Sequence, residues 1–174
     1  MNHRYHEMAK RGLNKLGKSN GVGLVAVVVD EVPYYVTNSD TKVAKAFTVR
    51  LRDIIQRGRA AGIIVILTAQ KPSTDSLPSS IRDLISLRIA FNCSTREASE
   101  TILGGSWSSE GYSSHRIALE RRGVGLFLGD SGIPILVKIY FISNEAIRAA
   151  VNNARNFRSA RRKGNPHGYE RKTV

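Results

Sequence analysis

Residues 24–31 read LVAVVVDE, an apolar run rich in β-branched side chains that ends in the two acids Asp30 and Glu31. A run without alternation of apolar and polar residues indicates a strand buried on both faces of a sheet. Residues 63–67, IIVIL, form a second run of this kind. Between them, the apolar spacing over 42–61 predicts a helix that stops before a glycine. The order strand, helix, strand favours a parallel sheet in an α/β fold.

The remainder of the chain continues this alternation and ends in a hairpin. Ser94 and Glu97 have the spacing of a capping box, which predicts the start of a helix that runs to about Leu103. Ser143 is the expected cap of a last helix that ends near residue 154. The sheet is therefore expected to be mostly parallel, with helices on its faces and a terminal antiparallel pair. Its further strands are expected at 87–91, 124–128 and 135–142.

The composition favours a partner that is a polyanion. The 174 residues include 27 Lys and Arg against 14 Asp and Glu, a formal charge of +13. This balance favours nucleic acid first and an anionic membrane surface second. The single cysteine, Cys93, excludes a disulfide scaffold and a cysteine-based zinc site. No apolar run has the length of a membrane-spanning helix, so we expect a cytoplasmic chain.

Most of the excess charge lies at the two ends. Residues 1–20 carry +4 and residues 155–174 carry +6, whereas 21–154 have an ordinary globular composition. We therefore expect a helical lead-in over 1–20, one folded body over 21–154, and a basic tail over 155–174 that lacks structure. The tail is either a solvated terminus or a nonspecific contact to phosphates, and the sequence leaves these two alternatives open.

The acids that end the first strand are the strongest local signal for function. A strand ending in Asp30 and Glu31 places carboxylates at the carboxyl edge of the sheet, where open α/β folds bind ligands. The first acid can hold Mg²⁺ and the second can orient a water for attack on a γ-phosphate. Gln70 follows the next strand, where its amide can contact phosphate and water. The alternatives are an acidic turn and a loop glutamine that satisfies the backbone.

Three stretches together resemble the motor domain of the FtsK/SpoIIIE family of DNA translocases. They are VVVDEVPYYV at 27–36, the segment from Arg50 to Gly105 that contains IIVILTAQ, and GVGLFLGDSGIPILVKIYFIS at 123–143. The resemblance also reaches back to HRYHEMAKRGLNKLGKSN at 3–20, which looks like the family's segment before its Walker B strand. It covers about residues 3–150, with the motifs in the family's order. It implies a RecA-like P-loop NTPase core, with the conjugative transfer proteins of the Streptomyces type as a possible subgroup.

The resemblance also implies roles for particular residues. Asp30 matches the Walker B acid that binds Mg²⁺, Glu31 the catalytic glutamate that also contacts ATP, and Gln70 the γ-phosphate sensor. Motors of this kind work as rings, which implies a homo-oligomer, expected to be a hexamer, around double-stranded DNA. An arginine from a neighbouring subunit is then expected at the nucleotide. Arg88 is the first candidate and Arg59 the second, against the alternative of a surface or helix-end arginine.

The pattern G-x-x-x-x-G-K-S occurs once, from Gly12 to Ser19, but its context differs from that of a Walker A loop. A working loop follows a buried strand and opens a helix, whereas this one follows a polar, helix-like segment. Only 11 residues separate Lys18 from Asp30, too few for a helix and a strand.

We therefore expect the C-terminal half of a motor, without the P-loop strand and helix, in a fragment, a split gene or a remnant. The missing elements would leave apolar sheet surface uncovered. A separate Walker A-bearing polypeptide is then a possible partner. The alternative is a basic DNA-binding remnant without catalysis, and chromosome segregation, plasmid conjugation and phage-borne transfer all remain open as settings.

Overall fold

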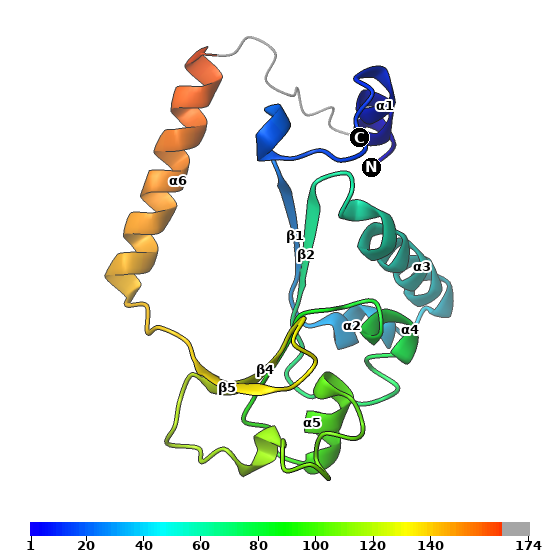
Figure 1. The fold of residues 1–174 in the computed structure, drawn as a ribbon, viewed down its shortest axis with the longest axis vertical. Helices are drawn as coiled ribbons and strands as arrows, with labels where there is room; N and C mark the ends of the chain where they lie inside the picture. Colours follow the sequence, from blue (N-terminus) through cyan, green and yellow to red (C-terminus); the bar gives the residue numbers. More distant parts are fainter. Residues whose placement is uncertain (165–174) are drawn as a thin grey trace. The chain divides into compact units, whose positions relative to one another are not determined.

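The structure is a computed structural model that describes residues 1–164, which form the ribbon of Figure 1. It divides into two compact units, of which the first is Met1–Lys138 and the second begins at Ile139. The predicted α/β class is confirmed, since the first unit contains one parallel and one antiparallel sheet.

The parallel sheet has two strands, β1 (Val25–Val29) and β2 (Ile63–Leu67), which lie side by side in Figure 1. They pair in register from Val25 opposite Ile63 to Val29 opposite Leu67. Helix α3 (Thr41–Gly58) connects them and packs against β2. It begins where the side chain of Asp40 accepts hydrogen bonds from the backbone N–H groups of the first turn, at 2.9 and 3.2 Å. The predicted strand, helix, strand order is present.

The two faces of this sheet differ in exposure. One face packs on a core of Val32, Leu51 and Ile81, all 3% exposed or less. On the other face Val28 is 63% exposed, and Ile64 and Ile66 are each 48% exposed. The prediction of strands buried on both faces is therefore wrong within the described residues. The expected uncovered apolar surface is present on this sheet.

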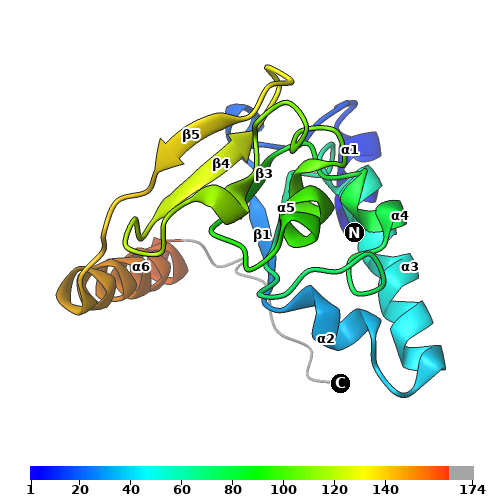
Figure 2. The ribbon, with the colours of Figure 1, turned by 90° about the horizontal axis from the view of Figure 1, so that it is seen from below.

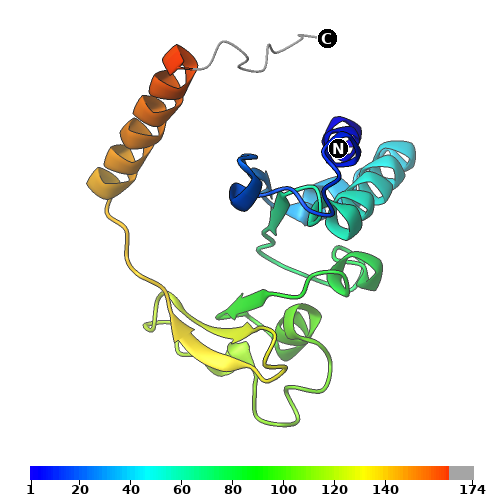
Figure 3. The same cartoon turned by 45° about the horizontal axis from the view of Figure 1, so that its top comes forward.

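The antiparallel sheet contains β3 (Arg88–Phe91), β4 (Val124–Leu128) and β5 (Ile135–Lys138), in that order (Figure 2). Helix α5 (Arg96–Leu103) contacts β3 and lies against this sheet in Figure 3. The expectation that 87–91 joins the parallel sheet is wrong, because β3 pairs antiparallel with β4. The last strand is shorter than 135–142, because its partner β4 begins at the residue opposite Lys138.

The N-terminal residues belong to the first unit. Helix α1 (Asn2–Lys10) covers about half of the predicted lead-in 1–20, and Met8 packs with Leu16 and Ala61 in a small core. The Arg4 side chain donates to the carbonyl of Ala61 at 2.5 Å and to that of Gly23 at 2.8 Å. The remaining short elements of this unit are α2 (Val32–Val36), α4 (Ser79–Arg82) and the 3₁₀ turns η1 (Lys18–Asn20) and η2 (Ser114–Arg116).

One predicted helix start differs by one residue, and another is observed as predicted. Helix α5 is capped by Thr95 rather than Ser94, because the Thr95 hydroxyl accepts from Ala98 N at 3.2 Å. Helix α6 (Asn144–Gly164) begins after Ser143, as predicted, and that hydroxyl accepts from Ala146 N at 3.2 Å.

Helix α6 also continues ten residues past its predicted end near 154. The expectation that the tail 155–174 lacks structure is therefore wrong for 155–164. Arginine is a strong helix former, and four of the ten residues 155–164 are arginine. The rest of the tail lies outside the described residues.

Candidate active site at the carboxyl edge of the parallel sheet

The structure brings together the three residues that the sequence placed at the strand ends, and it adds Thr68. The hydroxyl of Thr68 donates to Oδ1 of Asp30 and accepts from the backbone N–H of Glu31 at 3.1 Å. The backbone N–H of Gln70 donates to Oε2 of Glu31 at 3.0 Å. The ends of β1 and β2 are thus joined by a chain of hydrogen bonds that orients both carboxylates.

Glu31 has a strained backbone. Its φ of 54° and ψ of 65° lie in the left-handed region, and it is the one residue other than glycine with positive φ among the described residues. This conformation costs about 1–2 kcal/mol for an L-residue. It persists because Val32 N donates to Thr68 O at 2.9 Å and holds the chain on the far side of Glu31. Strain of this kind is found mainly at active sites and switch regions.

An apolar core directly supports this edge. Val32, the residue after Glu31, is fully buried and packs with Leu51 of α3 and Ile81 of α4. Three elements that follow or flank the strands therefore hold the turn in place, while Asp30 and Gln70 themselves are exposed. Rigid support of exposed polar groups is what a ligand site requires.

The donor set fits a hard divalent cation. Asp30 and Glu31 offer carboxylate oxygens and Thr68 a hydroxyl, which are ligands of the kind that Mg²⁺ takes. Within residues 1–164 no three His, Cys, Asp or Glu side chains gather in a metal-binding group. Mg²⁺ is usually held by one or two carboxylates, waters and substrate phosphates.

The two candidate arginines lie elsewhere. The guanidinium of Arg88 is half-buried and donates to the carbonyl of Ile85 at 2.9 Å and to those of Ile102 and Leu103 at 3.5 and 3.4 Å. Burial lowers the pKa of Arg88 from its ordinary value. Arg88 therefore binds the last carbonyls of α5 in this structure. Arg59 is exposed and follows the C-terminus of α3, at the opposite end of the sheet from Asp30.

The structure supports the prediction that Gly12–Ser19 is not a Walker A loop. The motif follows helix α1 instead of a strand, and its Lys18 begins a 3₁₀ turn of three residues. It lies next to Leu24 and Ile63, at the amino edge of the sheet. Asp30 and Glu31 lie at the carboxyl edge, one five-residue strand away, or about 15 Å.

Sequence reasoning missed the role of Thr68. Its position after the second strand was visible, but a hydroxyl there has many possible partners. Only the register that sets Val29 opposite Leu67 brings the following residues, Asp30 and Thr68, together. The signal available was a hydroxyl directly after the strand that neighbours the acidic one.

Curated DNA translocases align with most of this chain. FtsK of Sporosarcina ureae is 33% identical over 129 residues, which is 74% of this chain. SpoIIIE of Bacillus subtilis (strain 168) is 31% identical over 153 residues, or 86% of this chain. The chain belongs to the FtsK/SpoIIIE family. It spans 15% and 18% of the length of these two FtsK/SpoIIIE relatives.

Two solved structures share the fold of this FtsK/SpoIIIE chain. The pCW3 conjugation coupling protein TcpA, a monomer with ATPγS, matches with a TM-score of 0.65 at 16% identity, over 82% of this chain and 41% of TcpA. The cytoplasmic domain of the type VII secretion ATPase EccC of Thermomonospora curvata matches with 0.64 at 16% identity, over 81% and 16%. These likenesses confirm the predicted P-loop NTPase fold.

No family profile matches the chain. None of the helices within residues 1–164 is both long enough and apolar enough to cross a membrane.

Proposed function

We propose that this chain is the Walker B and sensor half of an ATP-driven motor that moves double-stranded DNA in the cytoplasm. The observation that carries the proposal is the hydrogen-bonded group of Asp30, Glu31, Thr68 and Gln70 at the carboxyl edge of the parallel sheet. The curated relatives are named DNA translocases, and a structural relative was solved with ATPγS. Both facts support ATP as the nucleotide and DNA as the substrate.

Each residue has a distinct task in this proposal. Asp30 binds Mg²⁺ through its carboxylate, and Thr68 orients that carboxylate by donating to Oδ1. Bound Mg²⁺ would neutralise charge on the phosphates of ATP. Glu31 orients the attacking water and accepts its proton, with its carboxylate held by the N–H of Gln70. The exposed Gln70 amide contacts the γ-phosphate.

The remaining parts are supplied by other segments or other subunits. A Walker A-bearing segment or polypeptide outside these 174 residues would bind the phosphates, because Gly12–Ser19 is at the wrong edge of the sheet. A homo-oligomeric ring, which we expect to be a hexamer, would supply an arginine finger. Arg88 serves there only if its guanidinium first leaves the carbonyls at the end of α5.

The test is to supply the missing half. The isolated chain should bind ATP very weakly and show no steady turnover, and Lys18→Ala should change neither. After addition of a Walker A-bearing half from an FtsK/SpoIIIE relative, we expect ATPase activity stimulated by duplex DNA and displacement of a triplex strand. A completed assembly that binds duplex DNA without ATP turnover would instead indicate the non-catalytic remnant.

Thr68→Val tests the hydrogen bonds at the strand ends. Valine keeps the shape of threonine but can neither donate to Asp30 nor accept from Glu31 N. Loss of a group that orients a metal ligand typically weakens metal affinity by about 10- to 100-fold. In the completed motor we therefore expect the Mg²⁺ concentration for half-maximal hydrolysis to rise by about that factor. Thr68→Ser should keep the wild-type requirement, and an unchanged Mg²⁺ requirement in Thr68→Val would contradict the role.

A further inference from the structure

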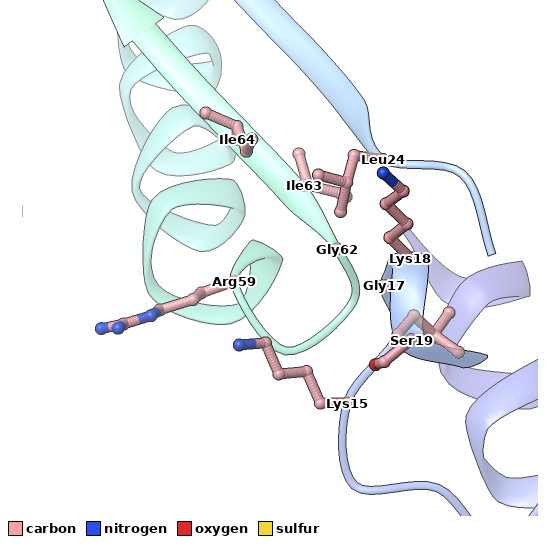
Figure 4. A pocket seen from close by; sticks show the side chains of 10 residues that line it. Lys15, Gly17, Lys18, Ser19, Leu24, Arg59, Gly62, Ile63 and Ile64 are labelled. Carbon is pink, nitrogen blue, oxygen red and sulfur yellow. The ribbon is translucent and has the colours of Figure 1, made fainter. Parts of the chain in front are cut away.

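A cavity of about 370 Å³ lies at the amino edge of the parallel sheet, away from the candidate active site. Its walls come from the loop around Gly17, from the residue before β1, and from the turn between α3 and β2 (Figure 4). Three of its lining side chains are cationic, namely Lys15, Lys18 and Arg59, and none is acidic. The loop is the part of the G-x-x-x-x-G-K-S pattern that the proposed function leaves without a role.

Within residues 1–164, no acidic side chain forms an ion pair with a cation of this cavity. The ion pairs of residues 1–164 join other side chains, including Arg11 with Glu7 and Arg57 with Asp53. Lys15, Lys18 and Arg59 take part in none of these pairs, and all three are exposed. Like charges that gather around one cavity repel one another unless an anion binds between them.

The frame that carries these cations is fixed before any ligand binds. Leu16, between the cations, is 1% exposed, and its N–H donates to the carbonyl of Ala60 at 2.8 Å. Asn20 closes the loop, since its side chain accepts from Gly17 N at 2.9 Å and donates to Lys15 O at 2.6 Å. A fixed backbone reduces the entropy that a ligand would otherwise have to overcome.

The chemistry of the lining selects against a nucleotide. The other lining side chains are Ser19 and the aliphatic Leu16, Leu24, Ile63 and Ile64, so no aromatic ring is available for stacking on a base. No carboxylate lines the cavity to hold a metal with a triphosphate. Three cations and a hydroxyl without base recognition suit phosphates of a nucleic-acid backbone, which are bound independently of sequence.

We infer that Lys15, Lys18 and Arg59 form a contact site for backbone phosphates of double-stranded DNA. This inference rests on the proposed function and adds a contact that the motor uses away from its ATP site. Lys15 and Lys18 come from one rigid loop and Arg59 from one helix end. Contacts to phosphates add affinity and fix the position of the protein along the duplex, but they do not recognise bases.

The experiment measures binding of a fluorescein-labelled 30-base-pair duplex of mixed sequence by anisotropy between 50 and 200 mM salt. The variant is Lys15→Ala/Lys18→Ala/Arg59→Ala. Each lost phosphate contact should lower the slope of log affinity against log salt by about 1, so we expect a decrease of about 2–3 and a clear loss of affinity. Lys15→Arg/Lys18→Arg should bind as the wild type does.

The matched control removes the same charge from another surface. Lys42, Lys45 and Arg50 are exposed on α3, and their triple alanine variant should keep most of the slope. If both triple variants lost the same amount of salt-dependence slope, the effect would come from net charge alone, and the inferred contact site would be refuted. The site is also overturned if the wild type binds duplex and the cavity variant binds equally well.

Two further results test whether the cavity binds ATP instead and whether the isolated chain binds DNA. Displacement of the duplex by millimolar MgATP, together with loss of ATP binding in Lys18→Ala, would make this a nucleotide site and overturn the inference. A wild-type chain that binds no duplex at 50 mM salt would overturn the inference, whereas the proposed function would then still be tested by duplex-stimulated ATPase activity of the completed motor. Wild-type binding with a lowered slope in the cavity variant supports both.

Discussion

Replacing Glu31 by Gln in the completed motor should stop hydrolysis and leave ATP bound. Glutamine keeps the size of the side chain and can still accept from Gln70 N, but it cannot take a proton from the attacking water. General-base catalysis contributes about 10²–10⁴-fold, so turnover should fall by at least about 100-fold. Binding of ATP should persist, because Asp30 and Thr68 still orient the metal side of the site.

The measurement is single-turnover hydrolysis of radiolabelled ATP, with nucleotide retention by filter binding. Glu120→Gln is the control, since Glu120 is an exposed carboxylate far along the chain from the strand ends. It should hydrolyse ATP at the wild-type rate. Normal turnover in Glu31→Gln would refute the role of Glu31 as the base and, with it, the central claim of the proposed function.

Gly62→Ala should strongly destabilise the first unit. Gly62 has φ +68°, and a Cβ there would lie 2.8 Å from Leu16 O and 2.9 Å from Arg4 Nη2. The left-handed backbone costs about 1–2 kcal/mol for alanine, and forcing a methyl group into a filled site adds about 1–3 kcal/mol. We expect the free energy of unfolding to fall by about 2–5 kcal/mol, measured by urea denaturation followed by circular dichroism.

Gly12→Ala separates these two effects. Gly12 has φ +61°, close to that of Gly62, but its Cβ would meet no atom within 4 Å. It should therefore lose only the backbone contribution of about 1–2 kcal/mol. Equal losses in the two variants would show that the close approach of the loop at Leu16 to the turn before β2 has no energetic weight.

The local pattern was sufficient for the parallel strand pair and its connecting helix. The β-branched runs at 25–29 and 63–67 and the apolar stripe between them depend on nearest neighbours and on helical spacing, which a sequence displays directly. The local sequence does not show which strand a short strand pairs with. Arg88–Phe91 pairs with β4, and the strands approach closely at Gly125, where a Cβ would lie 3.0 Å from Ala90 O.

The local pattern was also sufficient to place three residues of the candidate site, but the contacts that depend on strand pairing could not be predicted. Asp30, Glu31 and Gln70 end strands, and the carboxyl ends of neighbouring parallel strands share one edge of a sheet. The role of Thr68 and the left-handed backbone of Glu31 arise only when the two ends meet. The contacts of Arg88 could not be foreseen, because its carbonyl partners at Ile102 and Leu103 belong to the far end of another helix.

The backbone of Glu31 has a consequence for anyone who redesigns this protein. At φ 54° the residues that fit best are glycine and asparagine, so a sequence optimised for stability alone would replace the glutamate. Such a substitution would increase stability but remove the carboxylate that we assign to catalysis. In relatives, a conserved acid at such a position would indicate selection for ATP turnover at the expense of folding stability. A glycine there would indicate that hydrolysis has been lost.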